Sequence, residues 1–195
     1  MRDSLLVMSG DLDRTIGGKP VNVTEEPYKF RRSVYGYVDR GNLPELMAHF
    51  DFAKPEMANS KRTTTIVPQQ ALFLMNSPFT VDVVRRVVNR PEFPPLTVKG
   101  IEADRARITA LHRIIFQRMP RKDEYRMGLE FVQVESQDWD ANNFAAKNVN
   151  KGGRNRMDGR AEIKNEGFRV HRGALNQWET YAQALLFSNE AAYVN

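Results

Sequence analysis

The chain has 195 residues and an ordinary globular composition, with 41% hydrophobic and 27% charged residues. No apolar run approaches the ~18 residues of a membrane-spanning helix. The absence of cysteine excludes disulfides, thiolate nucleophiles, cysteine-ligated metal sites and covalently attached c-type haem. The net charge of +5 favours acidic partners somewhat, although a small domain with a solvated surface carries a charge of this size without any such partner.

The first quarter of the chain predicts the end of a helix, a loop and a strand. Residues 1–9 are apolar at several positions, and Gly10 supplies the glycine that commonly follows a helix. Because no capping residue precedes this helix, we expect the chain to open inside a larger domain. Residues 11–28 indicate a loop. Residues 32–38 alternate with the period of two that is typical of a strand, and Pro44 begins a short helix.

The run over residues 62–79, RTTTIVPQQALFLMNSPF, is the most informative stretch. It predicts an extended approach, a helix that begins at Pro68, a stop at Asn76, and a second helix that begins at Pro78. Proline suits the first helical position because its missing N–H has no partner there anyway, and Ser77 is a suitable N-cap. The first of these helices is so apolar that we expect it to be buried in the core.

The second half predicts three further helices. Valines spaced three and four apart favour a helix over residues 78–89, and a proline-containing connector over residues 90–100 follows. Residues 101–119 form the clearest helix, with an apolar face that ends at Met119. Residues 123–135 form a helix that should pair with it as a hairpin. The last helix, over residues 175–187, carries a stripe of apolar residues.

These patterns predict a mainly α fold: a single helical domain over residues 1–195 with a short β element in its N-terminal third. Before the last helix we expect a long irregular loop, a mobile insertion over residues 140–173 that is rich in Asn and Gly. Its basic residues are Lys147, Lys151, Arg154, Arg156, Arg160, Lys164, Arg169 and Arg172. They fit polyanion binding, with acidic or sulfated polysaccharide preferred to nucleic acid. The alternative is a solvated linker whose charges are partly balanced by nearby acids.

We assign no catalytic residue, no cofactor and no metal ligand from the sequence. The three histidines are far apart, and the Gly17-Gly18-Lys19-Pro20 run lacks the first glycine and the final Ser or Thr of a phosphate-binding loop. The remaining enzyme hypothesis is a dispersed site beside the central helix. Its residues are Arg62, Gln69, Gln70 and Asn76. A simpler interpretation is that these side chains satisfy backbone groups at helix ends.

Several of these runs resemble the planctomycete PSD-one domain, also called domain of unknown function 1553. The resemblance rests on RDSLL at residues 2–6, RRSVY at 31–35, TTIVPQQALFLMNSPF at 64–79 and QALLFSNE at 183–190. It spans nearly the whole chain apart from the Asn- and Gly-rich insertion. It implies that the chain is the C-terminal portion of such a domain.

The resemblance also implies a larger exported protein, periplasmic or extracellular, with upstream domains that often include a c-type cytochrome module. No haem motif lies in this chain, so no cofactor is carried over, and the family offers no established catalytic residues. The leading hypothesis is therefore a non-catalytic structural or interaction module of a larger exported multidomain protein. A polyanion-binding module and an enzyme with a dispersed site are the alternatives.

Overall fold

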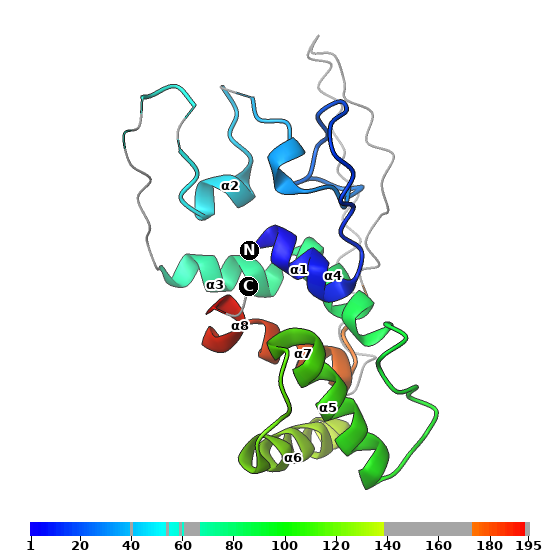
Figure 1. Ribbon diagram of the computed structural model, residues 1–195. Coiled ribbons are helices and arrows are strands. Elements are labelled where there is room, and N and C mark those ends of the chain that lie inside the picture. The colour runs from blue at the N-terminus through cyan, green and yellow to red at the C-terminus, as the bar shows by residue number, and fades with distance from the viewer. Residues whose placement is uncertain (40, 54, 59, 61–66, 139–172, 194–195) are drawn as a thin grey trace.

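The structure is a computed structural model that describes residues 1–39, 41–53, 55–58, 60, 67–138 and 173–193 (Figure 1). Its elements are α1 (Arg2–Ser9), the 3-10 helix η1 (Ser33–Tyr35), α2 (Glu45–His49), α3 (Pro68–Asn76), α4 (Pro78–Val88), α5 (Ile101–Phe116), α6 (Lys122–Asp138), α7 (Gln177–Leu186) and α8 (Asn189–Tyr193). The predicted mainly α fold is confirmed. The predicted basic loop lies outside the described residues.

The short β element expected over residues 32–38 is wrong. Residues 33–35 form a single 3-10 turn, and pairing there is limited to an isolated bridge between Val21 and Gly36. Val34, which belongs to this alternating run, is 71% exposed. Gly36 instead packs so closely on Val23 that a Cβ at this position would lie 2.7 Å from the valine side chain. The alternation therefore does not separate a buried face from a solvated one.

The hydrophobic core is built around α4, which packs against α1 and α7. This helix buries Phe79, Val83, Val84 and Val87, so the helix that the valine spacing predicted is confirmed. The α5–α6 pair and α7 complete the core at one end of the molecule, whereas α2 and the irregular N-terminal segment lie at the other (Figure 1). Trp178 of α7 is among the aromatic side chains buried at the end formed by α5, α6 and α7.

Helix α5 ends three residues earlier than its apolar pattern predicts. It closes at Phe116 because Gln117 adopts a left-handed conformation, with φ 57°. Met119, expected on the inward face, is consequently 54% exposed. The turn that follows carries Arg118, whose guanidinium pairs with Glu124 of α6 at 2.5 Å and with Glu190 of α8 at 2.6 Å. This arginine ties the hairpin turn to the C-terminal helix.

The irregular N-terminal segment is held by the buried guanidinium of Arg2. Its nitrogens donate to the carbonyl oxygens of Val23 at 3.0 Å, Arg31 at 2.8 Å and Lys29. The adjacent Asp3 carboxylate accepts from the Ser33 hydroxyl at 2.6 Å and from the Ser33 backbone N–H at 2.8 Å. A segment without a sheet ladder must pair its buried backbone groups in some other way, and one arginine supplies several of the partners. Burial lowers the pKa of Arg2 to about 10, so it stays charged at neutral pH.

Arg107 plays the same role for the proline-containing connector. Its buried guanidinium donates to the carbonyl oxygens of Pro95 at 2.6 Å and Val98, and it pairs with Asp104 at 2.7 Å. Its guanidinium carbon also lies 5.4 Å from the centre of the Trp178 ring. The connector is therefore fixed by the helix that follows it.

The substitution Arg2→Lys tests the role of the guanidinium fork, because lysine keeps the charge but cannot reach several carbonyls at once. We expect the free energy of unfolding to fall by about 2 kcal/mol, since buried carbonyls lose their donors. Urea denaturation followed by tryptophan fluorescence measures this change. The control is Arg105→Lys on the exposed side of α5, where a change below about 0.5 kcal/mol is expected. Equal unfolding midpoints for the two variants would contradict the assigned role.

The Arg118 pairs predict a pH dependence of stability. The Arg118 guanidinium lowers the pKa of Glu124 to about 2 and also lowers the pKa of Glu190. A carboxyl whose folded-state pKa is depressed stabilises the fold above its unfolded pKa, and this contribution is lost as the pH falls toward the folded value. Wild type should therefore be more stable than Arg118→Gln at pH 6, and this gap should shrink between about pH 4.5 and about pH 2. Thermal unfolding of both proteins across this range measures it; a gap that does not change with pH would refute the prediction.

Candidate functional site

Helix α3 is the unusual element of the fold, because it is apolar and yet mostly uncovered. It begins with Pro68 at its first position, as predicted. The expectation that it is buried is wrong: Leu74 is its one buried residue, while Leu72 is 57% and Met75 is 52% exposed. The reason is that its main packing partners are α2 and α4. These cover one side of the helix and leave the other open.

The open side forms what we call the outer face of α3, made of Val67, Ala71, Leu72 and Met75. Val67, Ala71 and Met75 follow each other at intervals of four, so they share one side of the helix, and all four residues are exposed. No residue of α3 is charged. Single exposed apolar residues are ordinary, whereas a contiguous apolar patch marks a contact surface.

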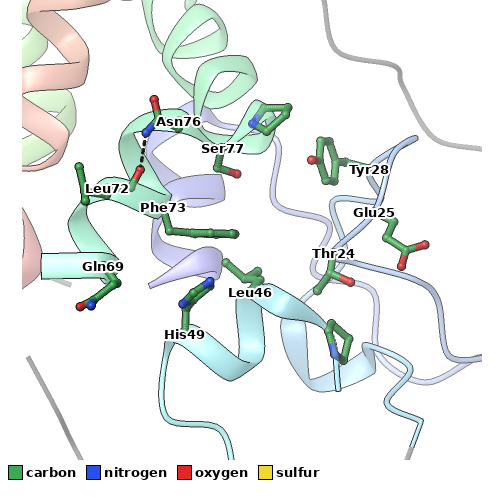
Figure 2. A pocket seen from close by; sticks show the side chains of 12 residues that line it. Thr24, Glu25, Tyr28, Leu46, His49, Gln69, Leu72, Phe73, Asn76 and Ser77 are labelled. Carbon is green, nitrogen blue, oxygen red and sulfur yellow. Dashed lines mark hydrogen bonds between the residues drawn. The ribbon is translucent and has the colours of Figure 1, made fainter. Parts of the chain in front are cut away.

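A first hollow of about 620 Å³ lies on one flank of α3. Figure 2 shows its walls: α3, the short helix α2, and the loop that carries Thr24, Glu25 and Tyr28. Leu72 and Phe73 contribute the α3 side. The volume lies within the range of small-molecule sites, roughly 300–1,000 Å³.

The polar groups of the first hollow come from different walls. The His49 ring of α2 lies beside the Phe73 ring, with 4.9 Å between the centroids (Figure 2). On the opposite wall the Tyr28 ring packs edge-on against Phe79 at 5.3 Å. At the rim the Glu25 carboxylate accepts a hydrogen bond from the Asn22 amide at 2.9 Å. The hollow thus combines aromatic walls with one carboxylate and one imidazole.

A second hollow of about 270 Å³ lies on the other flank of α3. Val67, Gln70, Ala71 and Leu74 line its α3 side. Met1, Phe50, residues of α1 and residues around the junction of α7 and α8 complete the lining. None of its lining residues is Asp, Glu, Lys or Arg. Helix α3 is therefore a ridge between two recesses, one of them with no charged side chain in its lining.

The polar residues singled out from the sequence divide between the two flanks. Gln69 and Asn76 line the first hollow, and Gln70 lines the second. The Gln70 amide donates to the His49 carbonyl at 2.9 Å, and the Asn76 amide donates to the Leu72 carbonyl at 3.0 Å (Figure 2). Gln70 thus satisfies the carbonyl at the end of α2, whereas Asn76 bonds to a carbonyl in the middle of its own helix. The dispersed enzyme site stays a prediction, because a hollow does lie beside Gln69 and Asn76.

Other sequence predictions have different outcomes. Arg62 lies outside the described residues, as do the eight basic residues of the expected polyanion-binding loop, so polyanion binding also stays a prediction. Ser77 occupies the N-cap position of α4 as expected, but its side chain makes no capping hydrogen bond. The sequence reasoning did not assign Glu25 or His49 to a site. They come from separate segments, and no local pattern links them.

The described residues contain no group of His, Asp or Glu side chains that could hold a metal ion. Among the same residues, no helix is both long enough and apolar enough to cross a bilayer.

Comparison with known proteins gives a match to a protein family. The family model PSD1, described as a protein of unknown function (DUF1553), matches residues 1–132, a stretch that includes α1 to α5 and the outer face of α3. No curated protein matches the chain, and no solved structure matches it.

Proposed function

The chain belongs to the PSD1 family, whose function is unknown, and on that premise we propose that it is a non-catalytic interaction module of a larger protein. Its contact surface is the outer face of α3. The family resemblance supports the further parts of the proposal: the chain is one domain, the C-terminal portion of a larger unit, and the complete protein is exported and carries upstream domains.

The observation that carries the proposal is the composition of the outer face. It presents leucine, methionine and valine to solvent on a helix without a charged residue. The cores of protein interfaces are depleted of charge and enriched in methionine and aromatic residues. Phe73 of α3 and His49 of α2 line the first hollow together with Leu72, so aromatic surface lies next to the exposed leucine.

The energy available from covering this face is substantial. Complete burial of a leucine or methionine side chain stabilises by roughly 1.5–3 kcal/mol. Leu72 and Met75 are each about half exposed, so a partner that covers both contributes on the order of 2 kcal/mol from these two side chains. Burial of the remaining apolar surface along the ridge adds to this value.

The proposal predicts that the exposed apolar residues of α3 are not needed for folding. The double variant Leu72→Gln/Met75→Gln keeps good helix formers on α3 and removes the apolar ridge. We expect its free energy of unfolding to differ from wild type by less than about 1 kcal/mol. The matched control Leu74→Gln places the same side chain at the buried position of α3, and we expect it to cost about 3 kcal/mol or more. Urea denaturation measures all three proteins.

If the double variant is destabilised as strongly as Leu74→Gln, the outer face is packed in the folded chain. The proposed contact surface would then be abandoned, because residues needed for the chain's own core are not available to a partner.

A further inference from the structure

We propose that His112 is a pH-sensitive switch: when its ring gains one proton under mildly acidic conditions, the packing between α5, α6 and α8 weakens. The inference is independent of the contact surface proposed above, because none of the residues that carry it belongs to α3. It is argued from the position of the ring, from the charges around it and from the hydrogen bonds that those charges already make.

The His112 side chain is enclosed in the core, and the residue is 1% exposed. Its ring packs edge-on against Phe116, with 5.3 Å between the centroids. Its Nδ1 atom lies 2.9 Å from the carbonyl oxygen of Ile108, one turn earlier in α5. Because a carbonyl oxygen can only accept, Nδ1 carries the proton of the neutral ring. Nε2 is therefore the atom that gains a proton on acidification.

Nε2 faces the charges that we call the turn cluster, made of Arg118, Glu124 and Glu190. It lies 3.8 Å from Oε2 of Glu124 on α6. The Arg118 guanidinium donates to both carboxylate oxygens of Glu124 and to both of Glu190 on α8. One guanidinium thus pairs with two carboxylates, and the cluster keeps one negative charge. The same three residues join the hairpin turn and α6 to α8.

The other helices packed against α5 are α4 and α7. The charged residues of α4 are Asp82, Arg85 and Arg86, and they pair with one another, with the N-terminal loop or with α7. On α7, Glu179 pairs with Arg85. Burial, with a smaller effect of the nearby Glu124, raises the pKa of Tyr181 to about 12, so this phenol is neutral. The turn cluster supplies the charges that act on the pKa of His112.

The hydrogen bonds of Glu124 leave no acceptor in place for a protonated ring. At 3.8 Å, Nε2 is beyond hydrogen-bonding distance of the carboxylate. Oε2 already accepts from Arg118 at 2.8 Å and from the backbone N–H of Arg121 at 2.6 Å. An imidazolium must either stay buried without an acceptor or draw Oε2 toward itself and weaken these two bonds. Both outcomes cost free energy that the neutral ring does not, and they act where α5, α6 and α8 meet.

The direction of the pKa shift of His112 is consistent with this cost. Burial lowers the pKa from its ordinary value of 6.5, although the Ile108 hydrogen bond and Glu124 oppose the shift. The unfolded chain then binds this proton more tightly than the folded chain, so stability falls as the pH drops from about 6.5 through the folded-state pKa. This window lies above that of Glu124 and Glu190, whose contributions are lost below about pH 4.5.

NMR of the whole 195-residue chain tests the inference without any substitution. The ring protons of His112 should titrate with a lower midpoint than in the same chain unfolded in urea. Amide hydrogen exchange in the first turn of α6 and in α8 is measured in parallel and corrected for the intrinsic effect of pH on exchange. These amides should exchange several-fold faster at about pH 5.5 than at about pH 7.5, and the increase should exceed that of the amides of α4.

The variant His112→Phe keeps an aromatic ring against Phe116 and removes the titrating group. In urea denaturation followed by tryptophan fluorescence, the ratio of folded to unfolded wild type should fall several-fold between about pH 7.5 and about pH 5.5. His112→Phe should lose most of this fall. The matched control is His49→Phe on α2, which removes a histidine outside the turn cluster and should keep the fall.

Three results would overturn the inference. One is a midpoint for His112 at or above that of the unfolded chain. Another is a loss of stability on acidification that His112→Phe leaves intact. The third is an increase in exchange at α6 and α8 that is no larger than in α4, because the proton would then weaken the whole fold and not this junction.

Discussion

The buried guanidinium of Arg2 is the interaction on which the N-terminal half of this fold depends. The segment between α1 and α2 forms no sheet in its described residues, so its buried carbonyls need donors from elsewhere. Arg2 reaches the carbonyls of Val23, Lys29 and Arg31 together. By fixing this segment it also positions the loop over residues 24–28, and that loop is the far wall of the first hollow beside α3.

Other arginines also pair carbonyl or carboxylate groups within the fold, and this bears on how the basic composition of the chain is interpreted. Arg107 holds the connector before α5, and Arg90 donates to the Met8 carbonyl at the end of α1. Arg118 joins α6 to α8 through Glu124 and Glu190. Several cations thus serve the fold itself, by pairing carbonyls and carboxylates. The net charge of +5 is therefore not by itself a signature of polyanion binding.

Helix α3 lies within the residues that match the family and also carries the proposed contact surface. It buries Leu74 and leaves Leu72 and Met75 open. An exposed apolar residue costs the isolated chain solvation free energy, which a partner recovers by covering it.

The helices could be read from the sequence because their signals are local. Pro68, Pro78 and Gly10 mark helix ends through their own backbone constraints, and the spacing of Ile108, Leu111 and Ile115 marks a buried face. These features act over a few residues and hold in any surroundings. They determined the mainly α fold class, and they placed Gln69 and Asn76 on the helix that borders the first hollow.

Burial and long-range neighbours were decided by the tertiary structure alone. An apolar helix is covered only where other elements reach it, so the sequence of α3 did not show that one side of it stays open. The residues around Val34 have strand propensity, but within the described part of the chain no partner strand lies beside them, and Arg2 and Asp3 bind this segment instead. Glu25 and His49 meet around one hollow although they are distant in the chain. Local preferences act within a few residues, whereas a site forms only where packing brings separate segments together.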